Sequence, residues 1–151
     1  MTAASAAWVR VALAVLCVVA TSCVVGDRSS ADPLPPAPAR VAITMHDYRF
    51  EIGGPVPTGR VIFEVTNRGT MTHSLSLIAL PEDFPPIDEQ LRGDVRRGAP
   101  TVARVPARPP GTGSRFALDA APGRYALVCF IADPDGVIHG AKGMNAEFRI
   151  I

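Results

Sequence analysis

Four side chains that bind soft metal ions occur in two segments of this 151-residue sequence. Cys129, His139 and Met144 lie within CFIADPDGVIHGAKGM, and His73 lies upstream in NRGTMTHSLSL. A thiolate and two imidazoles in a trigonal plane, with a weak thioether on the axis, are the ligands of a type 1 copper ion. These residues therefore predict a site for one copper ion that alternates between Cu+ and Cu2+.

The predicted ligands suit an ion that gains and loses one electron. The thiolate of Cys129 binds both oxidation states, and the imidazoles of His73 and His139 are borderline ligands acceptable to both. The thioether of Met144 stabilises the reduced ion and so raises the reduction potential relative to an oxygen ligand. A rigid β scaffold would keep the geometry nearly constant, so the site predicts a one-electron carrier.

The spacing allows one loop to carry three of these ligands. Nine residues separate Cys129 from His139, and four separate His139 from Met144. The loop begins at the end of a predicted strand over 123–130 and returns into another over 146–151. His73 directly precedes a predicted strand, so it can face the loop from across the fold.

The elements that must position these ligands are predicted to be strands. Short β-branched or alternating segments separated by Gly and Pro are typical of a β-sandwich or barrel. We predict strands over 41–45, 48–52, 60–67, 74–80, 114–120, 123–130 and 146–151, and one short helix over 87–95. The Pro- and Arg-rich segment 84–113 is predicted to be a solvated excursion at the sandwich edge, with a docking patch for an acidic partner as the alternative.

The blocks around His73 and from Cys129 to Met144 resemble the cupredoxin family, the plastocyanin and azurin type of blue copper protein. The resemblance includes the strand GRYALVCF, a following His, a GM pair and a closing strand, and it extends over 41–151. It implies an all-β, Greek-key β-sandwich. It also implies that His73, Cys129 and His139 are equatorial ligands and Met144 is the axial ligand.

Two positions depart from the family's pattern. The gap between Cys129 and His139 is longer than in the small electron carriers, and Ser74 stands where an Asn often braces the cysteine loop. We expect the shorter Ser74 side chain to brace less. A looser cage leaves open a copper-handling protein that binds and delivers the ion without redox cycling. A metal-free β-sandwich interaction domain, with Cys129 as a buried small hydrophobe, is the third alternative.

Redox partner proteins are predicted to dock near His139. We expect the edge of this imidazole to be partly exposed among apolar neighbours, namely Val137, Ile138 and Ala141. The nearly balanced charge, 15 basic against 14 acidic residues, excludes a strong basic surface for nucleic acid. No catalytic triad, phosphate-binding loop or pair of catalytic carboxylates is present, so we predict no enzyme. The run DPDG over 133–136 is predicted to be a tight turn.

Residues 1–23 have the pattern of an export signal, with Arg10, an apolar run over 11–20 and small residues before Cys23. The run is shorter than the roughly 20 residues that span a bilayer. The residues before Cys23 resemble a bacterial lipobox, which predicts a lipid anchor on Cys23 at the outer face of the cell membrane. Secretion after cleavage behind Ser22 is the alternative. Residues 24–39 are predicted to be a Pro-rich linker, and 40–151 the folded domain.

The cysteine count supports a metal site. Of three cysteines, Cys17 leaves with the signal and Cys23 carries the lipid, so Cys129 has no disulfide partner. An unpaired thiol in an oxidising compartment is a liability. Binding as a thiolate to a metal removes that liability.

Overall fold

The computed structural model describes residues 37–94 and 97–151. The predicted signal peptide, the lipidation at Cys23 and nearly all of the predicted linker lie outside the described residues. The first strand begins at Ala39, next to the predicted start of the domain. Within the described ranges, no helix is long and apolar enough to cross a membrane.

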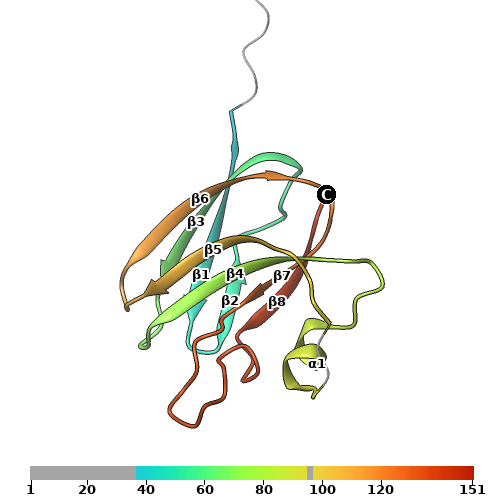
Figure 1. Ribbon diagram of the computed structural model, residues 1–151. Helices are drawn as coiled ribbons and strands as arrows, with labels where there is room; N and C mark the ends of the chain where they lie inside the picture. Colours follow the sequence, from blue (N-terminus) through green and yellow to red (C-terminus); the bar gives the residue numbers. More distant parts are fainter. Residues whose placement is uncertain (1–36, 95–96) are drawn as a thin grey trace, which may run out of the picture. The chain divides into compact units, whose positions relative to one another are not determined.

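The described residues form two four-stranded sheets (Figure 1). The first has the order β2-β1-β3-β6, with β1 (Ala39–His46), β2 (Arg49–Ile52), β3 (Gly59–Asn67) and β6 (Gly113–Ala120). The second has the order β5-β4-β7-β8, with β4 (His73–Leu80), β5 (Thr101–Arg108), β7 (Gly123–Val128) and β8 (Asn145–Ile150). The connections β3–β4, β5–β6 and β6–β7 pass between the sheets, as in Greek-key sandwiches. The predicted all-β sandwich is confirmed.

Alternating side chains build the core between the sheets. In β3, Val61, Phe63 and Val65 are buried, whereas Arg60 before them and Glu64 between Phe63 and Val65 are exposed. Each such buried side chain contributes roughly 1.5–3 kcal/mol. The alternation of apolar and polar residues therefore sets which face of the strand packs inward.

Strand β4 is buried on both faces, because a helix covers its outer side. Leu75 and Leu77 belong to the core between the sheets, and Ile78 packs in a second cluster with Leu91 of the helix. This helix, α1 (Ile87–Arg92), ends earlier than predicted, at Gly93, whose backbone is extended. The second cluster fixes α1 against the sheet that carries two of the predicted ligands.

Strand β5 was not expected within the segment 84–113. It pairs antiparallel with β4 at the sheet edge, and its register shifts between the partners of His73 and Leu75. Pro106 lies in this irregular stretch. Proline has no N–H to donate, so within a sheet it is tolerated on an edge strand or at a bulge. The predicted solvated segment at the sandwich edge is therefore confirmed in its exposure and position, but 101–108 is a paired edge strand, which was not predicted.

Three connections meet at one end of the sandwich, the lower end in Figure 1. They are the β1–β2 turn, the β3–β4 connection and the long β7–β8 loop. A hydrogen bond joins Asp47 in the first to His73 at the end of the second, and Tyr48 in the first to Asp133 in the third. This end holds the predicted ligands.

Candidate metal centre

His73, Cys129 and His139 converge on one point in the structure. Their ligand atoms lie within 4.8 Å of one another, and the three residues are 0%, 0% and 2% exposed. The two Nδ1 atoms are 3.1 Å apart, and Cys129 Sγ is 3.6 Å from His139 Nδ1. Nitrogen and sulfur ligands about 2.0 and 2.3 Å from one ion stand roughly 3–4 Å apart. The distances therefore fit a single ion bound by all three residues.

Both imidazoles are held by carboxylates on their outer nitrogens. His73 Nε2 lies 2.9 Å from Asp47 Oδ1, and His139 Nε2 lies 3.0 Å from Asp133 Oδ1. An ionised carboxylate only accepts hydrogen bonds, so each carboxylate favours the proton on Nε2 of its ring and leaves Nδ1 as the atom that can bind a metal ion. The two Nδ1 atoms face each other at 3.1 Å, so one cation between them could be bound by both rings. A carboxylate behind a ligating histidine is also the common arrangement at metal sites.

Asp47 is fixed by the residues before His73. It accepts hydrogen bonds from the Thr70 hydroxyl at 2.7 Å, the Thr70 N–H at 2.9 Å and the Met71 N–H at 3.2 Å. These bonds, with the Thr70 hydroxyl the largest cause and the His73 ring the next, hold the pKa of Asp47 well below its usual range. Asp47 is therefore ionised at neutral pH, and it orients the His73 ring.

Gly69 leaves the space that the Asp47–His73 contact needs. A Cβ added at Gly69 would lie 2.8 Å from His73 Nε2 and closer still to Asp47 Oδ1. We expect Gly69→Ala to break this contact and to weaken metal affinity about 10–100-fold, the usual effect of losing such a support. Titration of the metal-free protein with metal measures it. Gly98→Ala is the matched control, because a Cβ there meets nothing within 4 Å; an equal loss in both variants would contradict the expectation.

Asp133 and Lys142 cover the ring of His139. Asp133 accepts hydrogen bonds from Lys142 Nζ and from the Tyr48 hydroxyl, both at 2.6 Å. Led by Lys142, these bonds lower the pKa of Asp133 to about 2. The Tyr48 ring packs edge-on against His139, with ring centroids 5.3 Å apart. The prediction of a partly exposed imidazole edge was therefore wrong; of its three predicted apolar neighbours, only Val137 is exposed, at 41%.

The long gap between Cys129 and His139 is closed by a turn of its own. The Gly136 N–H donates to Asp133 O at 2.8 Å, and a bridge joins Ala132 to Ile138. The predicted tight turn is thus confirmed, and Gly136 has the positive φ, 79°, that such turns favour. The backbone then pairs back, with the Gly140 N–H donating to Cys129 O at 2.8 Å. Extra length in this loop therefore does not separate the two ligands.

Ser74 and Asn67 support the site on the other side. The Ser74 N–H lies 3.4 Å from Cys129 Sγ and its hydroxyl 3.6 Å, so Ser74 contacts the sulfur directly despite its short side chain. Asn67, fully buried, donates to the carbonyls of Met71 and Arg108 and accepts from the Gly69 N–H. Asn67 thereby stabilises the connection that presents His73.

Met144 lies on the same loop and is fully buried in the core. Its N–H donates to His139 O at 2.9 Å, and its carbonyl accepts from the Cys129 N–H at 3.1 Å. The backbone of Met144 is thus tied to two of the converging residues. Its role as an axial ligand stays a prediction. His46 lies apart from the site at the β1–β2 hairpin, with its Nε2 3.2 Å from Glu51 Oε2.

No family model and no curated protein matches this chain. Among solved structures it is similar to an auracyanin from Roseiflexus castenholzii, with 22% identity, a TM-score of 0.54, and coverage of 77% of this chain and 99% of that one. It is also similar to auracyanin A, a "blue" copper protein of Chloroflexus aurantiacus, with 16% identity and a TM-score of 0.52, over 76% of this chain and 100% of that one. Rusticyanin from Thiobacillus ferrooxidans is 18% identical with a TM-score of 0.51, over 76% of this chain and 79% of that one.

These similarities show the fold. The chain is a cupredoxin-like β-sandwich, the architecture of the auracyanins and rusticyanin, and the family resemblance of the sequence is confirmed at that level. At the end of this sandwich it carries a buried His, Cys and His cluster that could hold a metal ion.

Proposed function

We propose that this protein binds one copper ion through His73, Cys129 and His139, with Met144 on the axis, and acts as a one-electron carrier. The observation that supports the proposal best is the convergence of two imidazole Nδ1 atoms and one thiol in a buried cluster. Divalent copper also outranks zinc in affinity for such ligands. Auracyanin A, which shares the fold, is a "blue" copper protein.

Copper bound here would supply a centre that accepts and releases one electron. The protein's own residues would keep that centre's geometry constant. Asp47 and Asp133 hold the two rings in one orientation, and the Ser74 N–H and hydroxyl contact the sulfur. Because the three converging residues are at most 2% exposed, water is excluded from the ligand atoms.

The two alternatives predict different behaviour. A copper-delivery protein needs ligands that exchange readily, whereas these are buried and held by carboxylates on both rings. A metal-free interaction domain gives no reason for two imidazoles and a thiol to converge in a buried cluster, with a carboxylate behind each ring. Cyclic voltammetry of the copper-loaded protein tests the proposal: a carrier gives a reversible one-electron wave, and loss of copper during cycling would contradict it.

Met144→Gln is expected to keep copper bound but lower the reduction potential. An amide oxygen stabilises the reduced ion less than a thioether does. We expect a decrease of at least about 59 mV, which corresponds to a tenfold change for one electron. Voltammetry measures it. Met45→Leu, at another fully buried methionine, is the control and leaves the potential unchanged; an equal potential in all three proteins would remove Met144 from the ligand set.

We also propose that the protein works outside the cytoplasmic membrane and is not an enzyme. The pattern over 1–23 supports export, with the outer face of the membrane reached through a lipid on Cys23, or secretion as the alternative. Mass spectrometry of the mature N-terminus distinguishes the two. Redox partner proteins would dock near His139, beside the loop that carries it and away from the Lys142 side, where the imidazole is covered.

A further inference from the structure

An apolar groove lies beside the loop that carries Cys129 and His139. It has a volume of about 200 Å³ and runs between α1 and β5. Its walls include Phe84, Ile87, Leu91 and Phe130. Phe130 is 43% exposed, so a large aromatic ring is open to solvent at this position.

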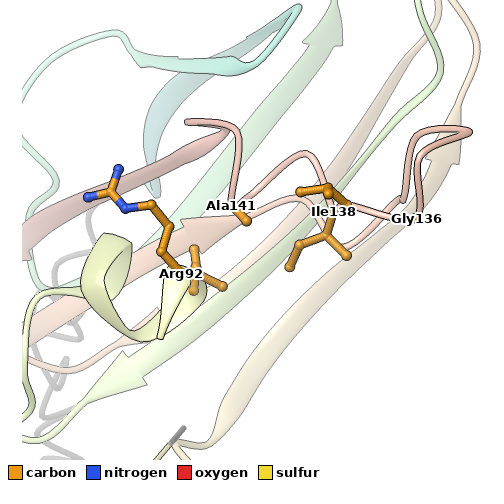
Figure 2. A pocket seen from close by; sticks show the side chains of 6 residues that line it. Arg92, Gly136, Ile138 and Ala141 are labelled. Carbon is orange, nitrogen blue, oxygen red and sulfur yellow. The ribbon is translucent and has the colours of Figure 1, made fainter. Parts of the chain in front are cut away.

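A second hollow continues the same face. It has a volume of about 400 Å³ and lies between Arg92 of α1 and the loop residues Ile138 and Ala141 (Figure 2). Leu91 lines both hollows, so the apolar surface extends from Phe130 to the exposed Val137. Both of these exposed residues belong to the ligand loop.

Phe130 gives the site a direct covalent connection to this face. It follows Cys129 in the chain, so one peptide bond joins the buried thiolate residue to an exposed ring. The ring of His139 offers no comparable exit, because Asp133 binds its outer nitrogen and Lys142 and Tyr48 bind Asp133. Electron transfer weakens steeply with distance, and Phe130, as the chain neighbour of Cys129, provides a short covalent route from the sulfur-bearing residue to the groove.

The charged residues of the groove are basic. Arg97 and Arg104 are its two charged residues, and the described lining holds no acidic one. Arg97 is paired with Asp83 at 3.1 Å and lies over the Phe84 ring. Arg104 is exposed and forms no ion pair with any residue in the described ranges. A partner carboxylate can therefore pair with Arg104 while an apolar side chain fills the groove.

We propose that an acidic redox protein docks in this groove, over Phe130, with an apolar side chain inserted and carboxylates beside Arg104. The inference rests on the proposed copper function. One electron passes from the reduced site through Cys129 and Phe130 to the oxidised centre of the partner. The site is oxidised and the partner is reduced by one electron, and no bond is broken. Charge complementarity favours fast association of the two proteins.

A peptide titration tests the surface independently of electron transfer. The probe is a hexapeptide of alternating leucine and glutamate, added to the isotope-labelled protein in its metal-free and Cu+ forms, with a leucine and lysine peptide as the comparison. We expect the glutamate peptide alone to shift the amide NMR signals of Leu91, Arg104 and Phe130. Equal shifts with both peptides, or shifts centred on Lys142, would overturn the proposal.

Matched variants sharpen the result. We expect Arg104→Gln to raise the dissociation constant of the glutamate peptide about two- to fivefold, the effect of one exposed ion pair. Arg115→Gln removes the same charge from β6 of the other sheet, and we expect it to leave the dissociation constant of the glutamate peptide unchanged. Phe130→Ala should weaken binding while the copper spectrum stays intact. Equal effects of the two arginine variants would contradict docking here.

Two further outcomes separate this inference from the function on which it rests. If voltammetry of the copper-loaded protein shows no reversible wave but the peptide still shifts the NMR signals, the proposed carrier function is wrong. The groove is then a binding surface without an electron path. If the wave is present and the peptide shifts nothing, the docking site is wrong. Concentration-dependent dimerisation that hides the Phe130 amide would assign the groove to a second copy and overturn the proposal.

Discussion

Cys129→Ser abolishes the intense visible absorption of the copper-loaded, oxidised protein. That absorption arises from charge transfer between a cysteine thiolate and Cu2+, and Cys129 is the cysteine that lies within reach of both imidazoles. A serine hydroxyl is not ionised at neutral pH and binds soft copper poorly. We expect essentially complete loss of the band, measured by absorption spectroscopy together with the copper content.

The control separates loss of the ligand from loss of the fold. Leu77→Val removes one methylene from the core next to β7 without touching a ligand atom. It should lower stability by about 1 kcal/mol and keep the band. If Cys129→Ser has the same visible spectrum as the unaltered protein, Cys129 is not a copper ligand and the proposal of a type 1 site is contradicted.

Removal of copper lowers the melting temperature by about 15 °C. A ligand present at a thousandfold excess over its dissociation constant stabilises the folded state by about 4 kcal/mol. Each kcal/mol corresponds to roughly 4 °C or more in a domain of about a hundred residues. Bound metal would also join His73 and His139, whose Nδ1 atoms are 3.1 Å apart, through one ion. Calorimetry of the copper-loaded and chelator-treated protein measures the difference.

Two histidine variants test whether this stabilisation comes from the proposed site. In His73→Ala the difference in melting temperature between the copper-loaded and the metal-free protein should nearly vanish. In His46→Ala, which alters a histidine bound to Glu51 at the β1–β2 hairpin, it should be unchanged. A comparable loss in both variants would place the metal elsewhere.

The site residues could be selected from the sequence because their chemistry is rare. Cys129, His139 and Met144 stand in one loop, and a strand pattern on either side places that loop at the end of a sandwich. His73 was found by its position before a strand. The structure brings His73, Cys129 and His139 together, and the Greek-key fold supplies the reason, since β4 and β7 are neighbours in one sheet.

The supporting residues could not be selected in the same way. Asp47 and Asp133 look like ordinary turn residues, and only the meeting of three separate connections places them behind the imidazoles. The burial of His139 depends on the side chains that cover it, which local patterns do not specify. Strand β5 escaped detection because Pro106 and its arginines mask the alternation, and pairing with β4 outweighs local preference.

The closed cover over His139 also bears on how the ion enters. Within the part of the chain that the structure describes, the Tyr48 and Lys142 bonds to Asp133 and the pairing of Gly140 with Cys129 cover the ligand residues, which are at most 2% exposed. The ion would then bind either when the β7–β8 loop opens transiently or before folding is complete. Uptake would be paced by that opening and not by copper supply, and a loaded molecule would hold its cargo through many oxidation cycles.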